Sequence, residues 1–397
     1  MNITCIPSYN YFDTPEFLTI ALHINSFLST PVYIFGIYVV LTKTPEQMKN
    51  VRWYLINSHI WIILFDYTLS IMVMPILLLP AFGGYTLGIL QLIGVSAFAQ
   101  VLLYLIMFGC MASSLVLVFE NRFSIICATQ IHFYWTKIRW ISIFCHFAYV
   151  FLGTIPLFSI FPDQKIAVPR MFSSLPCLPH YVYDAPVCVL AETYVYYLVI
   201  INVFMTICTL EVIFMVSFMS YTIVQQLKGH RLSRKTYEMQ KNFISALLLQ
   251  VSIPLMTIVL PMVPWLYFVL KSLHMQWVVN IGVVFMASHG CLATIVMMIA
   301  HRPYRDAIIF MIRKKTIVSV DNSIMVMIII GFWYCLWITN LGVIMFATHG
   351  AVATISMLIA HRPYREASLT MIRKRCAASV KNRRRAMDRN ALSNVQI

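Results

Sequence analysis

The feature that most constrains this chain is a series of seven stretches that are long, apolar and almost free of charge. Each is long enough to cross the hydrocarbon core of a membrane as a helix, which takes about 20 residues. Only helices and closed barrels satisfy their backbone polar groups in hydrocarbon, and runs of this length form helices. The sequence therefore predicts an all-α polytopic membrane bundle of seven transmembrane helices, at about residues 17–41, 54–81, 92–119, 139–161, 191–224, 243–270 and 278–300.

The composition excludes a water-soluble fold. Hydrophobic residues make up 60% of the 397 residues and charged residues only 11%, whereas soluble domains carry about 25% charged residues. The first apolar stretch has no Lys or Arg before it and is too long for a cleaved signal peptide. We therefore expect it to be the first spanning helix.

The positive charges lie between the apolar stretches and are divided unequally between the two sides. Of 29 Lys and Arg residues, 26 fall in alternate loops and the C-terminal segment, and the other 3 are Lys165, Arg170 and Lys271. Because basic loops stay in the cytoplasm, this asymmetry predicts an extracellular N-terminus and a cytoplasmic C-terminus. We expect such a basic face to meet anionic membrane lipids and acidic protein surfaces rather than nucleic acid.

This topology divides the chain into five parts. Asn2 begins a sequon, Asn2-Ile3-Thr4, and is a predicted glycosylation site on the outer tail. Cys5, Cys177 and Cys188 are all predicted to face the oxidising side, where one pair can form a disulfide bond that the sequence does not identify. The parts are an extracellular tail (1–16), the seven-helix bundle (17–300), a cytoplasmic juxtamembrane segment (301–322), a duplicated last-helix unit (323–375) and a basic cytoplasmic tail (376–397).

The end of the chain contains an internal repeat. Residues 279–315 recur at 339–375, with 22 of 37 positions identical. A single extra span would place ten Lys and Arg residues outside the cell, against the charge rule. Two explanations remain open: the apolar tract 323–360 forms two short spans, or the two copies are alternative endings joined in one gene model.

The third apolar stretch ends in a short charged motif, Glu120-Asn121-Arg122-Phe123. An acid and an Arg at a helix end can pair with each other or with a neighbouring helix, and so hold a closed state that breaks on activation. The alternative is an ordinary cluster of charges at the membrane edge.

Two further segments are candidate switch elements. The sixth stretch contains Pro254, Pro261 and Pro264, which can let a helix bend, although proline is common in membrane helices without such a role. The seventh stretch is followed by a basic segment in which alternating apolar residues predict a short amphipathic helix on the membrane surface, with a simple stop-transfer block as the alternative. That segment begins His301, Arg302, Pro303, Tyr304 and Arg305.

Three acidic residues fall inside the predicted spans, and an ionisable side chain in a membrane needs partners. Asp66, Glu192 and Glu211 are therefore candidate interior-facing groups, and for Asp66 we favour a functional polar network. For His289 and its repeat counterpart His349, a role in helix contacts is favoured over ligand binding.

A ligand site in such a bundle is expected in its outer half, among apolar and aromatic side chains with a few polar groups. The chain has no metal-like cysteine spacing and no catalytic motif, so we predict neither an enzyme nor a cofactor or metal site. The candidate ligand-binding residues are Gln100, Tyr104, Tyr194, Tyr197, Trp265 and Tyr267.

With these residues in view, the chain resembles the nematode serpentine chemoreceptors, most closely class H. The resemblance covers about residues 9–315. It rests on DTPEFLTIALHI before and within the first span, YIFGIYVVLTKTPEQMKNVRWYLINSHIW across the first cytoplasmic loop, FENRF, LPCLP in the second outer loop, and SHG followed by HRPYR.

The resemblance implies a G-protein-coupled receptor in the plasma membrane of chemosensory neurons, at the sensory cilium. Such a receptor detects small environmental molecules and signals to a heterotrimeric G protein. FENRF stands where rhodopsin-like receptors carry an acid-Arg pair, but Asn121 separates the acid from Arg122. The chain also has no cysteine at the outer start of the third span.

Our working hypothesis is that a ligand in the outer half of the bundle shifts the fifth, sixth and seventh helices between two packings. Arg122 and the loop 225–242 would then form the coupling surface. The alternative is an ion channel or transporter subunit. A repeat confined to one end disfavours a transporter, which typically carries a repeat in both halves.

Overall fold

The structure, a computed structural model, describes residues 10–46, 49–126, 130–229 and 233–315. Asn2, Cys5, the duplicated unit 323–375 and the tail 376–397 lie outside the described residues. Within the described part, seven helical segments are long and apolar enough to cross a membrane, which confirms the predicted all-α bundle. These spans are Pro15–Lys43, Lys49–Val73, Ala97–Ile126, Phe133–Ile160, Val195–Lys228, Thr236–Lys271 and Gln276–Ala300.

Several spans are built from more than one element. The elements of the spans are α1 (Pro15–Lys43), α2 (Lys49–Tyr67) with the π-helix η3 (Thr68–Val73), α4 (Ala97–Ile126), α5 (Gln130–Leu152) with α6 (Leu157–Ile160), α9 (Val195–Lys228), α10 (Arg234–Pro254) with the π-helix η4 (Leu255–Val259) and α11 (Leu260–Lys271), and α12 (Gln276–Ala287) with α13 (His289–Ala300). The remaining elements are η1 (Tyr11–Asp13), β1 (Pro75–Leu77), β2 (Gly83–Thr86), α3 (Ile89–Leu92), α7 (Gln164–Ser174), α8 (His180–Tyr183), β3 (Cys188–Val189) and α14 (Arg302–Lys315).

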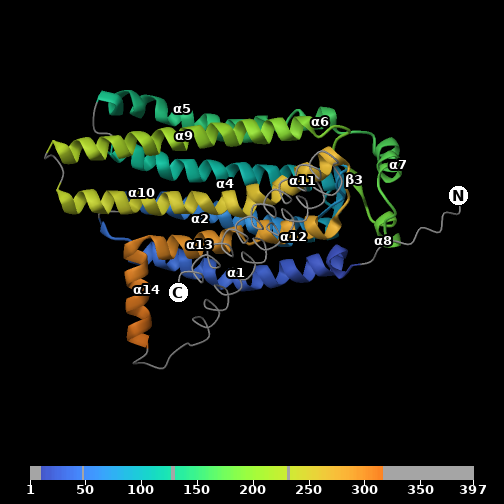
Figure 1. The fold of residues 1–397 in the computed structure, drawn as a ribbon, viewed down its shortest axis with the longest axis horizontal. Helices are drawn as coiled ribbons and strands as arrows, with labels where there is room; N and C mark the ends of the chain where they lie inside the picture. The colour runs from blue at the N-terminus through green and yellow to red at the C-terminus, as the bar shows by residue number, and fades with distance from the viewer. Residues whose placement is uncertain (1–9, 47–48, 127–129, 230–232, 316–397) are drawn as a thin grey trace, which may run out of the picture. The chain divides into compact units, whose positions relative to one another are not determined.

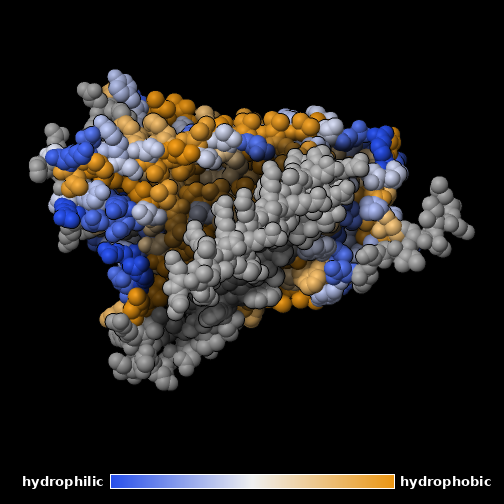
Figure 2. Space-filling model, viewed as in Figure 1, coloured by the Kyte–Doolittle hydropathy of each residue, from blue (hydrophilic) through white to orange (hydrophobic). Residues whose placement is uncertain are grey.

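The long helices run alongside one another and give the bundle two chemically different ends (Figure 1). At the end that we call the basic end, α1, α4, α9 and α13 finish and α2, α5 and α10 begin. At this end α14 runs crosswise to the long helices. At the other end, the sheet end, lie the three strands with α7 and α8. Figure 2 shows hydrophobic residues covering much of the face between the ends and hydrophilic residues gathered towards them.

Polar caps start two of the helices where the sequence leaves the apolar pattern. The first four N–H groups of a helix lack intrahelical partners. Thr14 precedes α1, and its Oγ1 accepts a hydrogen bond from the N–H of Phe17 at 3.2 Å. Ser233 precedes α10, and its Oγ accepts from the N–H of Thr236, also at 3.2 Å. The first span therefore starts two residues before the predicted residue 17, whereas α10 starts nine residues before the predicted residue 243, because its first turns are polar and lie ahead of the apolar run.

The second span ends earlier than predicted. The prediction extended it to residue 81, but its helix ends at Val73, and Met74 adopts a left-handed conformation with φ of 43°. The next residue is Pro75, which disfavours the α region for Met74. Residues 75–77 instead form β1, which pairs antiparallel with β2, and β2 pairs with β3. The apolar run continued past the proline, so hydrophobicity alone missed both the helix end and the sheet.

At the sheet end, the structure also corrects the predicted position of one acidic residue. Glu192 was predicted to lie inside the fifth span, but α9 begins only at Val195. Glu192 is exposed and pairs with Arg170 of α7, with Nη1 and Oε1 2.9 Å apart. Glu211 does lie within the span, where its Oε2 is 3.0 Å from Nε2 of His146 on α5.

The cysteines of the outer loops are also distinguished by the structure. Cys177 is disulfide-bonded. Cys188 is a free, buried thiol, and burial raises its pKa to about 11. Of the three cysteines that the sequence placed on this side, Cys188 is therefore excluded from the bond.

The seventh span is broken at Ser288, between α12 and α13, and polar side chains of other helices satisfy the break. Asn25 of α1 donates from Nδ2 to the carbonyl oxygen of Ala287 at 2.8 Å. Asp66 of α2 accepts from the N–H of Gly290 at 2.7 Å and from the Tyr33 hydroxyl at 2.5 Å. Asp66 is 1% exposed. The predicted interior position of Asp66 thus has a structural reason, because it completes the backbone hydrogen bonding of a neighbouring helix.

We predict that Gly290→Ala destabilises the bundle. A Cβ at this position would collide with Oδ2 of Asp66 and lie 2.7 Å from Cγ2 of Ile62 and 2.8 Å from the Tyr33 hydroxyl. Forcing an extra carbon into such a contact costs about 1–3 kcal/mol. The expected result is a lower melting temperature of the purified protein in detergent, measured by size-exclusion chromatography after heating.

Gly229→Ala is the matched control, because Gly229 ends α9 with φ of −79°, a conformation that alanine adopts freely. Equal melting temperatures for the two variants would contradict the packing described at Gly290.

Candidate ligand cavity and coupling site

A cavity of about 400 Å³ lies between α2, α4, α9, the sixth span and α13. It opens between α9 and the sixth span, where Ile213 and Leu255 of its lining are exposed. No Asp, Glu, Lys or Arg occurs among the described residues that line it. Most of the lining is aliphatic, with Met111, Met205 and Phe108 among the larger side chains. Its few polar side chains come from four helices and are Ser58, His59, Thr209, Ser217, Gln250 and His289.

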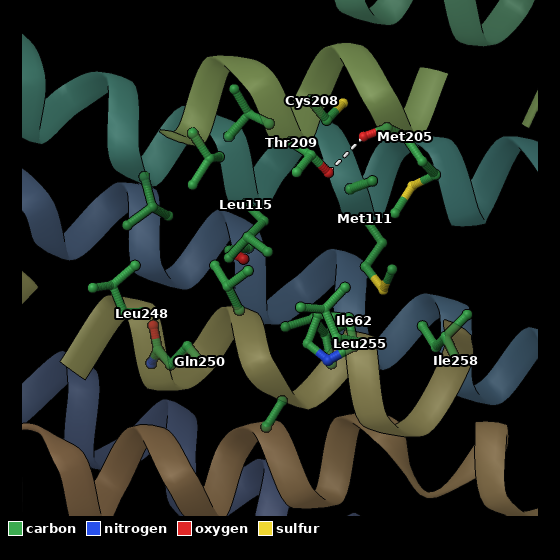
Figure 3. A pocket seen from close by; sticks show the side chains of 18 of the residues that line it. Ile62, Met111, Leu115, Met205, Cys208, Thr209, Leu248, Gln250, Leu255 and Ile258 are labelled. Atoms are coloured by element: carbon green, nitrogen blue, oxygen red, sulfur yellow. Dashed lines mark hydrogen bonds between the residues drawn. The ribbon is translucent and has the colours of Figure 1, made fainter. Parts of the chain in front are cut away.

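The sixth span borders this cavity at its irregular section. Pro254 ends α10, and the π-helix η4 follows directly. Proline lacks an N–H and disturbs the preceding turn, and single π turns are frequent beside functional sites. In Figure 3, Leu255 and Ile258 of η4 lie across the cavity from Met205 and Thr209 of α9. Of the three sixth-span prolines, Pro254 therefore lines the cavity, whereas Pro261 and Pro264 lie in α11 and do not.

The chemistry of the cavity fits a small uncharged molecule. Pockets for small ligands are concave and mostly apolar, with volumes of about 300–1,000 Å³ and few polar groups that orient the ligand. The Thr209 hydroxyl is already used, because it donates to the Met205 carbonyl oxygen at 2.7 Å. His289 is 3.1 Å from the Thr257 hydroxyl. Among the described residues, no group of His, Cys, Asp and Glu is placed to hold a metal ion.

The ligand-binding residues predicted from the sequence lie at another level of the bundle. Gln100 is fully buried and donates from Nε2 to the Val95 carbonyl oxygen at 2.8 Å. The Tyr197 hydroxyl donates to the Leu190 carbonyl oxygen at 3.4 Å. Tyr104 packs on Phe65. These three residues lie on the sheet-end side of the cavity, and none lines it.

The other three predicted ligand residues do not line the cavity either. Tyr194 directly precedes α9, Trp265 packs against Gly282, and Tyr267 is 43% exposed on the outer face of α11. Trp265 and Tyr104 do contact the same buried cluster at the sheet-end half. Their role in ligand binding remains a prediction.

The cavity residues that the sequence analysis missed carried a weak signal. Ser58, His59 and Gln250 are polar residues inside apolar runs, and polar groups in a span tend to face the bundle interior. The sequence-based selection of interior-facing groups emphasised acidic residues and did not include these three. The apolar lining residues carry no signal of this kind, because a cavity wall and a packed core use the same residue types.

At the basic end, Glu120 pairs with a neighbouring helix rather than with Arg122. Its Oε1 lies 2.9 Å from Nε of Arg139 and 2.9 Å from Nε1 of Trp135, both on α5. Glu120 is 2% exposed. This pair connects α4 to α5, the third span to the fourth, so it does not bridge to the sixth span.

Arg122 makes a different contact, with the sixth span. Its guanidinium carbon lies 3.6 Å from the ring centroid of Phe243 on α10, within the range of a cation–π interaction. The Phe243 ring also packs on His301, and His301 packs on Tyr304, with centroid distances of 5.1 and 5.6 Å. We call Arg122, Phe243, His301 and Tyr304 the basic-end latch, because they join the third, sixth and seventh spans to α14.

The segment after the seventh span forms the helix that the sequence predicted. In α14, Pro303 lies in the first turn, and Tyr304 is fully buried with its hydroxyl 2.9 Å from Oγ1 of Thr44. Ile308 and Met311 pack against the same core. Arg302 is exposed, and Arg305 donates from Nη1 to the Ile299 carbonyl oxygen at 3.3 Å. The apolar side of this helix thus covers the basic end of the bundle.

Comparison with known proteins identifies a family. The model of the family described as "Serpentine type 7TM GPCR chemoreceptor Srh" matches residues 13–314 and, separately, residues 316–374. The second match contains all but the last residue of the second copy of the internal repeat. Serpentine receptor class H-72 of Caenorhabditis elegans is 24% identical over 318 residues, which cover 79% of this chain and 91% of that relative. Among solved structures, squid rhodopsin is similar with a TM-score of 0.47 and 12% identity, covering 82% of this chain and 92% of that one.

We predict that the latch weakens in mild acid. Burial, and then the charge of Arg122, lower the pKa of His301 from 6.5 to about 4. The unfolded chain therefore takes up a proton at His301 below pH 6.5, whereas the folded chain does so only near pH 4. The stability contributed by neutral His301 is fully present above pH 6.5 and is lost as the pH falls towards 4.

The measurement is the melting temperature of the receptor at pH 7.5 and at pH 5. His301→Phe keeps the ring contacts but cannot be protonated, so its decrease should be smaller than that of the unmodified receptor. His180→Gln, which alters an exposed histidine at the sheet end, is the control and should retain the full decrease. An unchanged decrease in His301→Phe would contradict the assignment.

Proposed function

The chain belongs to the Srh family of serpentine seven-transmembrane chemoreceptors, and on this premise we propose that it detects a small uncharged molecule and signals to a heterotrimeric G protein. The observation that carries the proposal is the central cavity, which is apolar, free of charged residues along its described lining and bordered by the irregular sixth span. We propose this cavity, rather than the level of Gln100 and Tyr197, as the primary ligand site.

The proposed orientation has the basic end in the cytoplasm and the sheet end outside. Its support is the division of charge, since the Lys and Arg residues at the sheet end are only Lys165, Arg170 and Lys271 among the described residues. We propose the plasma membrane of sensory neurons, at the cilium, as the location. The G protein then meets the basic end, where Arg122 and the residues around the α9–α10 loop provide the contact surface.

The proposed mechanism connects the cavity to the latch through α10. This helix contributes Gln250 and Pro254 to the cavity and Phe243 to the latch. A ligand that binds more tightly to one packing of α10 shifts the population towards that packing. Displacement of α10 moves Phe243 away from Arg122 and uncovers the guanidinium group at the basic end. The Glu120–Arg139 pair, which does not involve α10, stays in place.

We predict that filling the cavity weakens detection of the ligand. Thr209→Trp places a large ring where Thr209 lines the cavity, whereas Thr206→Trp makes the same change on the same helix away from it. In cells with a G-protein reporter, the probe is the most active compound from a panel of neutral esters, ketones and alcohols. Thr209→Trp should raise its half-maximal concentration at least about tenfold, equivalent to 1.4 kcal/mol.

Surface labelling must show equal amounts of both variants. Equal half-maximal concentrations for Thr209→Trp and Thr206→Trp would exclude the central cavity as the ligand site.

We further predict that Phe243→Leu raises signalling without ligand. The substitution keeps an apolar side chain but removes the ring over which Arg122 lies. A cation–π contact contributes about 0.5–2 kcal/mol, so its loss should shift the equilibrium towards the active packing roughly 2- to 30-fold. Phe243→Trp retains an aromatic face and should keep basal signalling low. Equal basal signalling in the Leu and Trp variants would exclude the latch as a restraint on activation.

A further inference from the structure

A second cavity lies at the basic end, separate from both the central cavity and the latch. It has a volume of about 590 Å³ and is formed where α2 begins and where α4 and α5 come together. Three of its lining residues are cationic, Lys49, Arg52 and Arg139, and no acidic residue lines it within the described part of the chain. We call this cavity the basic cleft.

Asn121, the residue that separates the acid from the arginine in the charged motif, points to a ligand in this cleft. Asn121 lines the cleft and is only 6% exposed, yet its Oδ1 has no hydrogen-bond partner among the described residues. A buried polar group without a partner is costly. An amide offers both donors and an acceptor, and the two ends can exchange by rotation, so Asn121 can present N–H groups to an anion.

The cationic groups around Asn121 are only partly neutralised. Glu120 pairs with Arg139 in the protein interior, and Glu46 pairs with Lys49 in an exposed contact of 3.1 Å. Arg52 has no carboxylate partner in the described ranges, and its Nε is buried without a hydrogen bond. Its guanidinium lies 5.1 Å from the Trp53 ring centroid.

The surroundings of the cleft are those of a membrane interface. Trp53 beside it is 61% exposed, and Trp140, on which Arg139 stacks at 5.5 Å, is 67% exposed. Exposed tryptophans collect at the depth of lipid headgroups, because one part of the ring is apolar and its N–H is polar. An anion that reaches the cleft at this depth can therefore be part of a lipid.

We propose that the basic cleft binds the phosphomonoester of an anionic phospholipid headgroup, of the phosphorylated inositol class. A phosphomonoester carries a charge of about −1.5 to −2 and three strong acceptor oxygens, which match the guanidinium of Arg52, the ammonium of Lys49 and the amide of Asn121. A phosphodiester such as phosphatidylserine offers fewer acceptors at one point. The proposed orientation decides which side of the membrane supplies this lipid. Binding of the lipid to the cleft does not depend on that orientation.

The test uses the full-length receptor in neutral detergent and native mass spectrometry, which counts bound lipids. The probes are phosphatidylinositol bisphosphate, phosphatidylserine and water-soluble inositol trisphosphate, each at the same concentration. Phosphatidylinositol bisphosphate should bind most tightly. Arg52→Gln, which removes a charged donor, should lower its affinity by about tenfold, and Asn121→Ala should lower it by a smaller amount.

Arg170→Gln makes the same substitution at an exposed arginine of the sheet end and should leave the affinity unchanged. Only variants whose melting temperature equals that of the unmodified receptor are compared. If Arg52→Gln does not fold, Asn121→Ala takes its place as the test variant. No ligand or G protein is present, so failure of the proposed receptor function leaves this result unaffected.

Three outcomes overturn the proposal. One is affinity that is the same in Arg52→Gln, Asn121→Ala and Arg170→Gln, since the lipid would then bind elsewhere. Another is equal binding of phosphatidylserine, which would mean attraction to any negative lipid. The third is inositol trisphosphate binding as tightly as the lipid, which would assign the cleft to a soluble phosphate.

Discussion

The break in the seventh span is the constraint on which the rest of the bundle depends. Between α12 and α13 the helix is interrupted at Ser288, and backbone groups freed inside a membrane cannot be left to water. Asn25 of α1 binds the free carbonyl of Ala287, and Asp66 of α2 binds the free N–H of Gly290. The first, second and seventh spans are therefore tied at one level, and only Gly at position 290 leaves room for the carboxylate.

The same break determines which residue of the seventh span faces the central cavity. His289 directly follows Ser288, lines the cavity and contacts Thr257 of η4 in the sixth span. Two irregular helix sections, one in the sixth span and one in the seventh, thus meet beside the cavity. Because α10 continues from there to Phe243 and α13 continues to His301, both walls of the cavity reach the latch through uninterrupted helix. A change in packing at the cavity has a direct mechanical route to the basic end.

Three adjacent residues of the charged motif face three different parts of the bundle. Successive residues on an α-helix are about 100° apart, so adjacent side chains point in different directions. Glu120 faces α5, Arg122 faces α10, and Asn121 lines the basic cleft beside α2. Of the two pairings expected from the sequence, the one between the acid and its own Arg is absent here, and the one with a neighbouring helix is present. Arg122 contacts the sixth span through a cation–π interaction rather than an ion pair.

The sequence by itself determined the number of spans, their approximate limits, the separation of basic from non-basic loops, the family, and the need for Asp66 to be buried with partners. These depend on properties that each residue carries alone: apolar side chains must leave water, and a charge must avoid hydrocarbon. Tertiary structure decided where the second span ends in a sheet, which helix Glu120 and Arg122 each contact, and where the cavity lies. The cavity is a gap between five spans whose walls use the same apolar residues as the packed core, so its position depends on how the helices fit together and not on any local pattern.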